Sequence, residues 1–240
     1  MLVHGAYEKA KLYIEMHSKE KEELDKKKNK IEPGPTITIS RQTGAAAGKI
    51  SDLIIDILKS KCTKCRREWA VFDKNIIEKI IEDHNLPKRL SNFLSEEKHS
   101  FLNSMMNELF GIHPSPIKLV HKTAKTILQL AEIGNVIIIG RAANIITRKM
   151  PNTYHVRIIA PLYIRINNVR EYFNIDKDEA IKFIEREDKK RKEYVEHYYS
   201  KNIADPTLYD LVINAEKHQP EEIAQIISRA VMIKLKDYFI

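Results

Sequence analysis

The segment from Thr36 to Ser51 has the sequence of a phosphate-binding turn between a strand and a helix. It begins with alternating β-branched residues, passes through small residues and then follows a helical pattern. Small residues let backbone N–H groups approach a phosphate closely, and the N-terminal end of the next helix is positive. The residues that we predict to hold phosphates here are Arg41, Gly44, Ala45, Ala46, Ala47 and Gly48.

This segment departs from the strict P-loop motif, which is GxxxxGK[ST]. Relative to Gly48-Lys49, the motif would have Gly at position 43 and Ser or Thr at position 50, whereas the chain has Thr43 and Ile50. Lys49 follows Gly48 as the lysine of the motif does, and we take it as a candidate catalytic residue. Because small residues between a strand and a helix also serve close packing, the segment alone leaves both a phosphate site and a packing turn open.

A second candidate group lies in the helix that the pattern predicts from Asp176 to Tyr199. An apolar stripe on this helix is interrupted by Asp188 and Arg191, and the residues of the stripe are Ile181, Ile184, Val195 and Tyr198. Unpaired charges would cost several kcal/mol to bury. The two residues therefore pair with each other at their i,i+3 spacing, face a polar cavity that holds an anion, or project into solvent.

Composition and charge limit the class of protein. The chain has 240 residues, is 43% hydrophobic and contains no apolar run long enough to span a bilayer. Its N-terminus lacks the apolar core of a secretory signal, so we expect a soluble, cytoplasmic protein without a membrane partner. The only cysteines, Cys62 and Cys65, cannot complete a zinc site within one chain; free thiols are the expectation, and a redox pair or an intersubunit metal are the alternatives.

The net charge of +8 comes largely from two basic runs, at residues 26–30 and 186–192. Such runs can bind nucleic acid, but no helix-turn-helix, zinc finger or aromatic RNA-binding pattern accompanies them. We therefore expect a polyanionic nucleotide, or simply a solvated surface, rather than nucleic acid.

Strands and helices alternate along the chain. The expected strands after the first are Trp69–Phe72, Asn135–Ile139, Tyr154–Ala160 and Leu208–Asn214, with helices between them. This order predicts an α/β fold with a five-stranded parallel sheet flanked by helices. Ligands of such sheets bind outside the carboxyl ends of the strands, where Arg41, Asp73 and Arg141 fall. Ahead of the sheet, residues 1–35 are expected to form a helical extension, with Leu12, Ile14 and Met16 at helical spacing, and a linker.

Several segments in order resemble the cytidylate kinase-like family of P-loop nucleotide kinases. They are ISRQTGAAAG, FDKNIIEKI, GNVIIIGRAAN, YHVRIIAPLYIRI and EREDKKRKEYVEHYYSKNIADPTLYDLVINAEK, and together they span roughly residues 36 to 228. The resemblance implies a P-loop kinase-like domain over residues 36–240, with a helical acceptor subdomain at 86–131 and a lid at 176–204. It also implies phosphoryl transfer from ATP, with Mg²⁺, to a nucleoside monophosphate, CMP or dCMP.

The same resemblance implies roles for single residues. The donor phosphates would lie on Gly44 and its neighbours, and the acceptor nucleotide on Arg141. Asp188 and Arg191 form the D-x-x-R pattern of the lid, Arg165 matches another basic position of the lid region, and Asp73 matches an acidic residue on the acceptor side. From the residues alone, Asp73 could equally be a helix N-cap, Arg141 a structural ion pair and Arg165 a surface residue.

The glycine loop departs from the family pattern, which is usually G-S-G-G-R or G-S-G-G-H. Three alanines replace its small polar and glycine positions, and Gly48 stands where a basic residue is common. Each alanine adds a methyl group where phosphate oxygens must approach. The alternative function is therefore a non-catalytic nucleotide-binding or regulatory protein with a degenerate P-loop.

Overall fold

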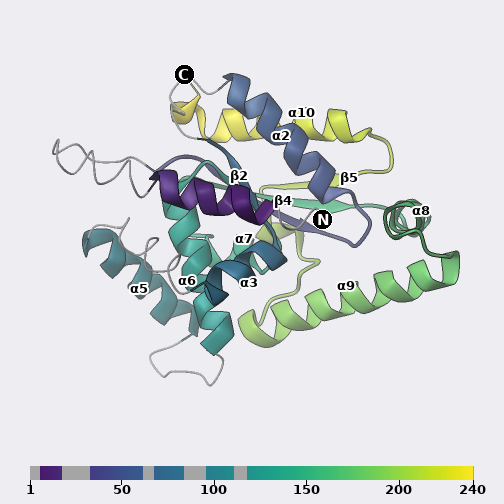
Figure 1. Cartoon of the computed structure of the whole chain (residues 1–240), viewed down its shortest axis with the longest axis horizontal. Coiled ribbons are helices and arrows are strands. Elements are labelled where there is room, and N and C mark those ends of the chain that lie inside the picture. The colour runs from purple at the N-terminus through teal and green to yellow at the C-terminus, as the bar shows by residue number, and fades with distance from the viewer. Residues whose placement is uncertain (1–5, 18–32, 62–67, 84–95, 111–117, 240) are drawn as a thin grey trace.

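A computed structural model describes residues 6–17, 33–61, 68–83, 96–110 and 118–239 of the chain. Its centre is a parallel sheet with helices on both faces (Figure 1). The five strands are β1 (Thr36–Arg41), β2 (Ala70–Phe72), β3 (Val136–Ile139), β4 (Thr153–Ile159) and β5 (Leu211–Asn214). They lie in the order β2-β3-β1-β4-β5, and every pair is parallel, which confirms the predicted fold class.

The central position of β1 follows from its pairing on both edges. Thr36 is in register with Val136 of β3 on one side and with Thr153 of β4 on the other. Because all strands run the same way, the ends of β1 and β3 lie at one edge of the sheet. This arrangement brings Arg41, at the end of β1, near Gly140 and Arg141, which follow β3.

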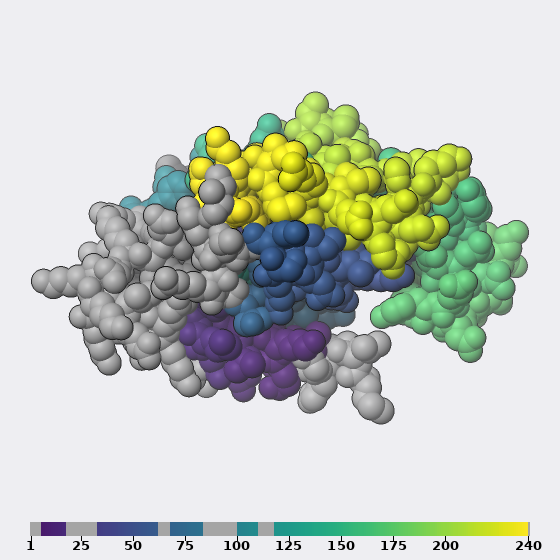
Figure 2. Space-filling model, turned by 90° about the horizontal axis from the view of Figure 1, so that it is seen from above, coloured from purple at the N-terminus to yellow at the C-terminus, as the bar shows by residue number. Residues whose placement is uncertain are grey.

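Helices α2 (Ala47–Lys61) and α10 (Pro220–Lys234) cover one face of the sheet. Figure 2 looks onto this face, where the blue α2 lies beside the yellow α10. The side chains of Ile37 and Ile39 point into this layer, because alternate residues of a strand face the same side.

The other face carries more elements. They are α3 (Lys74–Glu82), α5 (Glu96–Phe110), α6 (Lys118–Ile133), α7 (Ala143–Ile146) and the C-terminal part of α9 (Lys177–Tyr199). Helix α8 (Leu162–Phe173) lies beside the turn that follows β1 and packs on α9. In Figure 1 the long α9 runs along the lower side of the molecule, opposite α2 and α10. Short 3-10 turns occur at Pro206–Leu208 and Lys236–Tyr238.

The start and end of α9 follow from local sequence. Asp176 caps its first turn by accepting a hydrogen bond from the Glu179 N–H, and the Glu179 side chain accepts one from the Asp176 N–H. This reciprocal capping box fixes where the helix begins. The helix ends at Ser200, whose left-handed φ of 51° breaks the helical backbone.

The N-terminal helix packs on the core. Residues 6–17 are helical, and Tyr13 is buried against Phe72 with its hydroxyl donating to the Gly134 carbonyl. Of the three apolar residues noted at helical spacing, Ile14 is buried, whereas Leu12 and Met16 are 57% and 46% exposed. Residues 1–5 and 18–32 of the expected extension and linker lie outside the described residues, as do Cys62 and Cys65.

Two further elements differ from the sequence expectation. Helix α6 was expected in a helical insertion, but most of its residues are buried, and Ala124, Ile127 and Leu128 belong to the main core beside β3. The last strand begins at Leu211 rather than Leu208, because Asp205 caps a 3-10 turn that takes up the residues before it. No helix within the described ranges is long and apolar enough to cross a membrane.

Candidate active site

The small-residue turn joins β1 to α2 at the carboxyl edge of the sheet. Gly44 has a φ of +83°, and a Cβ atom there would lie 2.5 Å from the carbonyl oxygen of Arg165, so only glycine fits. Asn168 of α8 holds the turn from the same side, because its side-chain amide donates to the Gly44 carbonyl at 2.7 Å. Ala46 also has a left-handed backbone, with a φ of 55°, which is strained for a residue with a Cβ atom.

A network of hydrogen bonds ties this turn to α9. Asp188 accepts from the Thr43 N–H at 2.9 Å and from the Thr43 hydroxyl at 2.8 Å. The same carboxylate pairs with Arg165 of α8 at 2.5 Å and with Arg191 at 2.8 Å. The polar break in the α9 stripe is therefore explained by pairing: Asp188 and Arg191 contact each other and also the phosphate turn.

Burial and hydrogen bonding act in opposite directions on Asp188. Burial raises the pKa of its carboxyl group, whereas hydrogen bonds from Thr43, Arg165 and Arg191 lower it, and the net shift is downward. The carboxylate is therefore charged at neutral pH and holds both arginines. Arg165 is itself buried, with only 11% of its side chain exposed, so it is not a surface residue of α8.

Arg141 follows β3 in a left-handed turn, with a φ of 53°. It forms an ion pair with Glu78 of α3, and its guanidinium lies 5.5 Å from the centre of the Tyr194 ring of α9. Its Nε atom is buried and has no hydrogen-bond partner in the part of the chain that the structure describes. The ion pair expected as the structural alternative thus exists, yet the side chain also lines a cavity.

Arg41 is a buried cation whose side chain has no partner among the described residues. Its guanidinium forms neither an ion pair nor a hydrogen bond with them. Burial lowers its pKa to about 10, and the positive charge of Arg191 acts in the same direction. A charge held in this way is stabilised by an arriving anion. Gly140 makes room for it, because a Cβ atom there would lie 2.3 Å from Arg41 Nη1.

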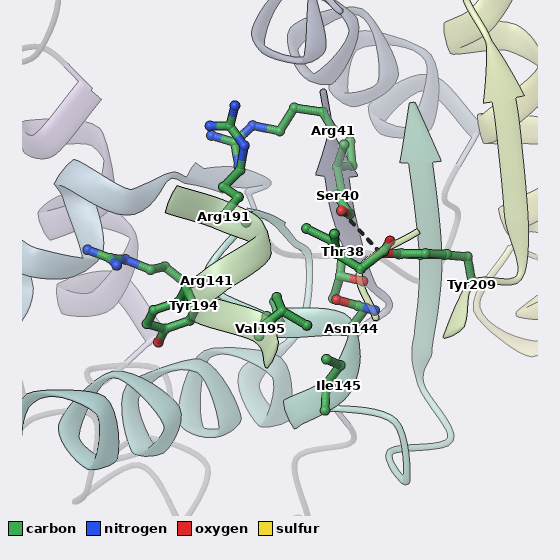
Figure 3. A pocket seen from close by; sticks show the side chains of 15 residues that line it. Thr38, Ser40, Arg41, Arg141, Asn144, Ile145, Arg191, Tyr194, Val195 and Tyr209 are labelled. Atoms are coloured by element: carbon green, nitrogen blue, oxygen red, sulfur yellow. Dashed lines mark hydrogen bonds between the residues drawn. The ribbon is translucent and has the colours of Figure 1, made fainter. Parts of the chain in front are cut away.

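These side chains meet at one cavity, which we call the arginine cavity. Figure 3 shows the ends of Arg41 and Arg191 close to each other, with Arg141 beside the ring of Tyr194. Val195 and Ile145 form an apolar floor, and Ser40 and Tyr209 are joined by a 3.3 Å hydrogen bond at the far side. Arginines from β1, the turn after β3 and α9 therefore line one cavity, and Arg191 also contacts Thr43 of the turn that follows β1.

The comparison with protein families agrees with this geometry. A model of the cytidylate kinase-like family matches residues 36–217, which hold the whole sheet, the turn and α9. The chain belongs to this family.

Relatives in the family share most of their length with this chain. A cytidylate kinase of Methanocaldococcus jannaschii is 28% identical over 65% of this chain and 89% of its own. A cytidylate kinase of Methanococcus aeolicus is 27% identical over 67% of this chain and 92% of its own. Among solved structures, an uncharacterized protein from Eubacterium ventriosum covers 82% of this chain and 97% of its own with a TM-score of 0.64 at 18% identity, which supports the fold.

Two of the predicted site residues, Asp73 and Lys49, do not line the arginine cavity. Asp73 caps α3 by accepting from the Ile76 N–H at 2.9 Å, which is the N-cap that the residues alone allowed. Lys49 does not join the other cations, because its ammonium group lies 3.1 Å from Glu221 of α10 and both side chains are more than half exposed. Gly48 lies beside it on the exposed start of α2.

Sequence analysis missed the polar residues on the sheet under α9. Ser40, Arg157 and Tyr209 contact one another there, and Asn144 of α7 lies nearby in the cavity wall. A signal for Arg157 was present: His155 and Arg157 alternate with apolar residues in β4, so they share one face of the strand. The sequence analysis predicted the strand but no role for the polar residues on this face.

The donor set suits phosphate groups. It offers an unpaired guanidinium, two further arginines and the backbone amides of a strand-to-helix turn. Within the residues described, no three acidic, histidine or cysteine side chains cluster to form a metal site. The Ser51 hydroxyl is not free to bind a metal, because it donates a hydrogen bond to the Ala47 carbonyl inside α2. Mg²⁺ fits such a site when phosphate oxygens and water supply most of its ligands.

Proposed function

We propose that this protein transfers the γ-phosphoryl group of ATP to a nucleoside monophosphate, CMP or dCMP, in a Mg²⁺-dependent reaction. The observation that supports it is the convergence of Arg41, Arg141 and Arg191 on one cavity beside the phosphate turn. Phosphoryl transfer needs two phosphorylated molecules held in line with their negative charge neutralised, and little covalent chemistry from the protein. Arginines from separate elements meet this requirement.

The two substrates occupy opposite sides of the arginine cavity in this proposal. The amides of Gly44 and of residues 46–48, at the N-terminus of α2, hold the donor phosphates, whereas the Ala45 N–H donates to the Gln42 carbonyl inside the turn. Arg141 holds the acceptor phosphate, and Glu78 with the Tyr194 ring keeps its guanidinium in place. Bound Mg²⁺ supplies positive charge to the phosphate oxygens during transfer. Asp73 lies at the acceptor side, where its carboxylate could orient a metal-bound water in addition to capping α3.

The lid residues act together. Asp188 positions Arg165 and Arg191, because it pairs with both, and the arginines then present N–H groups to the transferring phosphoryl group. Closure of α8 and α9 over the substrates would exclude water from the reaction.

Lys49 takes part in the proposed donor site only after leaving Glu221. That pair is exposed and screened by solvent, so it holds Lys49 only weakly and phosphate binding can offset its loss. Its role in catalysis is therefore part of the proposal and is separate from the arginine cluster.

The alternative is a nucleotide-binding protein without turnover. It is favoured by the phosphate turn itself, where Ala46 holds a strained left-handed backbone and Ala45 provides no hydroxyl group. A coupled assay of ADP release with CMP, dCMP, UMP and AMP decides between the two. Nucleotide binding without ADP release for any acceptor would refute the kinase and support the alternative.

A further inference from the structure

Arg157 is a buried cation on a central strand of the sheet. It lies in β4 between β1 and β5, and its exposed fraction is 8%. Its side chain is on the face of the sheet that carries Thr38 and Ser40, opposite the apolar layer under α2 and α10. Central strands of parallel sheets are usually apolar on both faces, so a charged residue here needs an explanation.

The direct partners of Arg157 are neutral. Its Nη1 donates to the Ser40 hydroxyl at 3.0 Å and to the Tyr209 hydroxyl at 3.4 Å, and its guanidinium lies 5.6 Å from the centre of the Tyr209 ring. Across the described ranges of the chain, no carboxylate comes within ion-pair distance of it. A buried charge is costly unless a charge of opposite sign compensates it.

Arg157 lines a cavity, which we call the β4 cavity, of about 280 Å³. That volume is near the lower end of the range for ligand pockets, about 300 to 1,000 Å³. Its other polar walls are Arg41, Gln42, Asp188, Lys189, Arg191 and Lys192. Arg41 and Arg191 also line the arginine cavity, so the two cavities adjoin across these two side chains.

The charges around the β4 cavity favour an anion. Asp188 is the one carboxylate among the described residues of its wall, and it is already paired with Arg165 and Arg191. Arg41 and Arg157 have no such partner. Burial of Arg157 makes its guanidinium a preorganised donor, which is the type of group that binds phosphate through two parallel N–H bonds.

We propose that the β4 cavity is a second anion subsite for a phosphoryl group, with Arg157 as its buried cation. The subsite extends the proposed function, because a nucleotide spanning both cavities would place one phosphate on each side of Arg41 and Arg191. It rests on anion binding alone and does not require turnover. The anion is either a phosphoryl group of a nucleotide or free inorganic phosphate.

The test measures binding of inorganic phosphate, CMP and ATP to the full chain by calorimetry. Arg157→Met should weaken the binding of the anion that occupies the subsite about ten-fold or more, because it removes a charged hydrogen-bond donor. The control is Arg186→Met, which removes the same charge from an exposed position of α9 paired with Glu187. It should leave each affinity within about two-fold of wild type.

Thermal unfolding without ligand distinguishes a subsite from a structural role. If Arg157 serves an anion, Arg157→Met removes an uncompensated buried charge, so the melting temperature stays the same or rises while anion binding weakens. If the only role of Arg157 is to donate hydrogen bonds to Ser40 and Tyr209, the melting temperature of Arg157→Met falls and its affinities for phosphate, CMP and ATP do not change. That result would overturn the proposal. Weakened phosphate binding indicates a free anion, and weakened binding of CMP or ATP alone indicates a nucleotide; either supports the subsite.

A measurement on the wild-type protein covers the case in which Arg157→Met does not fold. Phenylglyoxal modifies arginine side chains, and mass spectrometry locates the modified residues. Phosphate or nucleotide should slow modification of Arg157 at least several-fold and leave that of Arg186 unchanged. Equal modification of Arg157 with and without each ligand would overturn the proposal. The kinase assay is independent of this result, so failure of the subsite and failure of the proposed function can be told apart.

Discussion

The carboxylate of Asp188 accepts two hydrogen bonds from Thr43, one from the backbone N–H and one from the hydroxyl. These residues are 145 positions apart in the sequence, and their contact joins the turn after β1 to α9. The position of α9 is therefore coupled to the turn that is proposed to hold the donor phosphates. The contact also sets the positions of Arg165 and Arg191, which share the same carboxylate.

Replacement of Asp188 by Asn should lower the free energy of unfolding by about 1 to 3 kcal/mol, because the buried Arg165 loses its anionic partner. Urea denaturation measures the change. Asp178→Asn, an exposed change in the first turn of the same helix, is the control and should shift stability by about 0.5 kcal/mol or less. Removing Arg165 as well, in Arg165→Met with Asp188→Asn, should recover part of the loss. Equal losses in Asp188→Asn and Asp178→Asn would contradict the network.

Arg191→Ala should reduce turnover far more than stability. We expect kcat with ATP and CMP to fall about 100-fold or more, since the side chain is proposed to contact the transferring phosphoryl group. The melting temperature should fall by only a few degrees, because Arg191 is partly exposed. Lys190→Ala, at an exposed position on the same helix, should change neither quantity appreciably. A parallel loss of turnover and stability would instead assign Arg191 a purely structural ion pair.

Gly140→Ala should weaken nucleotide binding and destabilise the fold. The glycine has a φ of +82°, and an added Cβ atom would meet the Arg41 guanidinium. Gly48→Ala is the matched control, because a Cβ atom there has nothing within 4 Å. Since Gly48 lies in α2, alanine should stabilise the helix by about 0.5 to 1 kcal/mol. Thermal unfolding compares the two variants, and calorimetry with CMP tests Gly140→Ala alone, because Gly48 belongs to the proposed donor turn. An equal change in stability in the two variants, or unchanged CMP binding in Gly140→Ala, would show that Gly140 does not make room for Arg41.

Ala46→Gly should favour phosphate binding. The left-handed backbone of Ala46 costs roughly 1 to 2 kcal/mol that glycine does not incur, although glycine loses part of this gain through its greater freedom in the unfolded chain. The methyl group is also removed from the turn where phosphate oxygens must approach. The expected result is a lower Kd for ATP, and increased turnover if the protein is a kinase. Weaker ATP binding in the variant would argue against the turn as the donor site.

His155 should make the protein less stable as the pH falls. Burial lowers its pKa from 6.5 to about 4, Lys234 and Arg148 act in the same direction, and Asp210 opposes them. The unfolded chain then takes up a proton before the folded one, so stability is complete above pH 6.5 and is lost as the pH falls toward 4. The loss is on the order of 3 kcal/mol.

Urea denaturation across this pH range checks the prediction. His155→Asn should flatten the dependence between pH 6.5 and 4, whereas His218→Asn, at an exposed position before α10, should keep the wild-type slope. A wild-type slope in His155→Asn would mean that other groups cause the acid sensitivity.

Several features could be predicted from the sequence because they depend on local interactions. The strands follow from β-branched and apolar runs such as residues 136–139, and the helix predicted from Asp176 to Tyr199 is found as α9 (Lys177–Tyr199) with Asp176 as its N-cap. The capping of α9 depends on Asp176 and Glu179, which are only three positions apart in the sequence. The polar break at Asp188 and Arg191 was also visible, since it interrupts a helical period within one element.

The tertiary structure alone decided which partners these residues take. The sequence placed Asp188 on a helix, but only the packing of α9 against the phosphate turn gives it Thr43 and Arg165. Lys49 was expected at the phosphates by its position in a motif, yet the neighbouring α10 offers it Glu221. Arg157 could be proposed as an anion-binding residue only from the tertiary structure, because residues of α9 and the turn after β1 form the other walls of its cavity. Local patterns fix backbone conformation, whereas the environment of a charge depends on segments far apart in the chain.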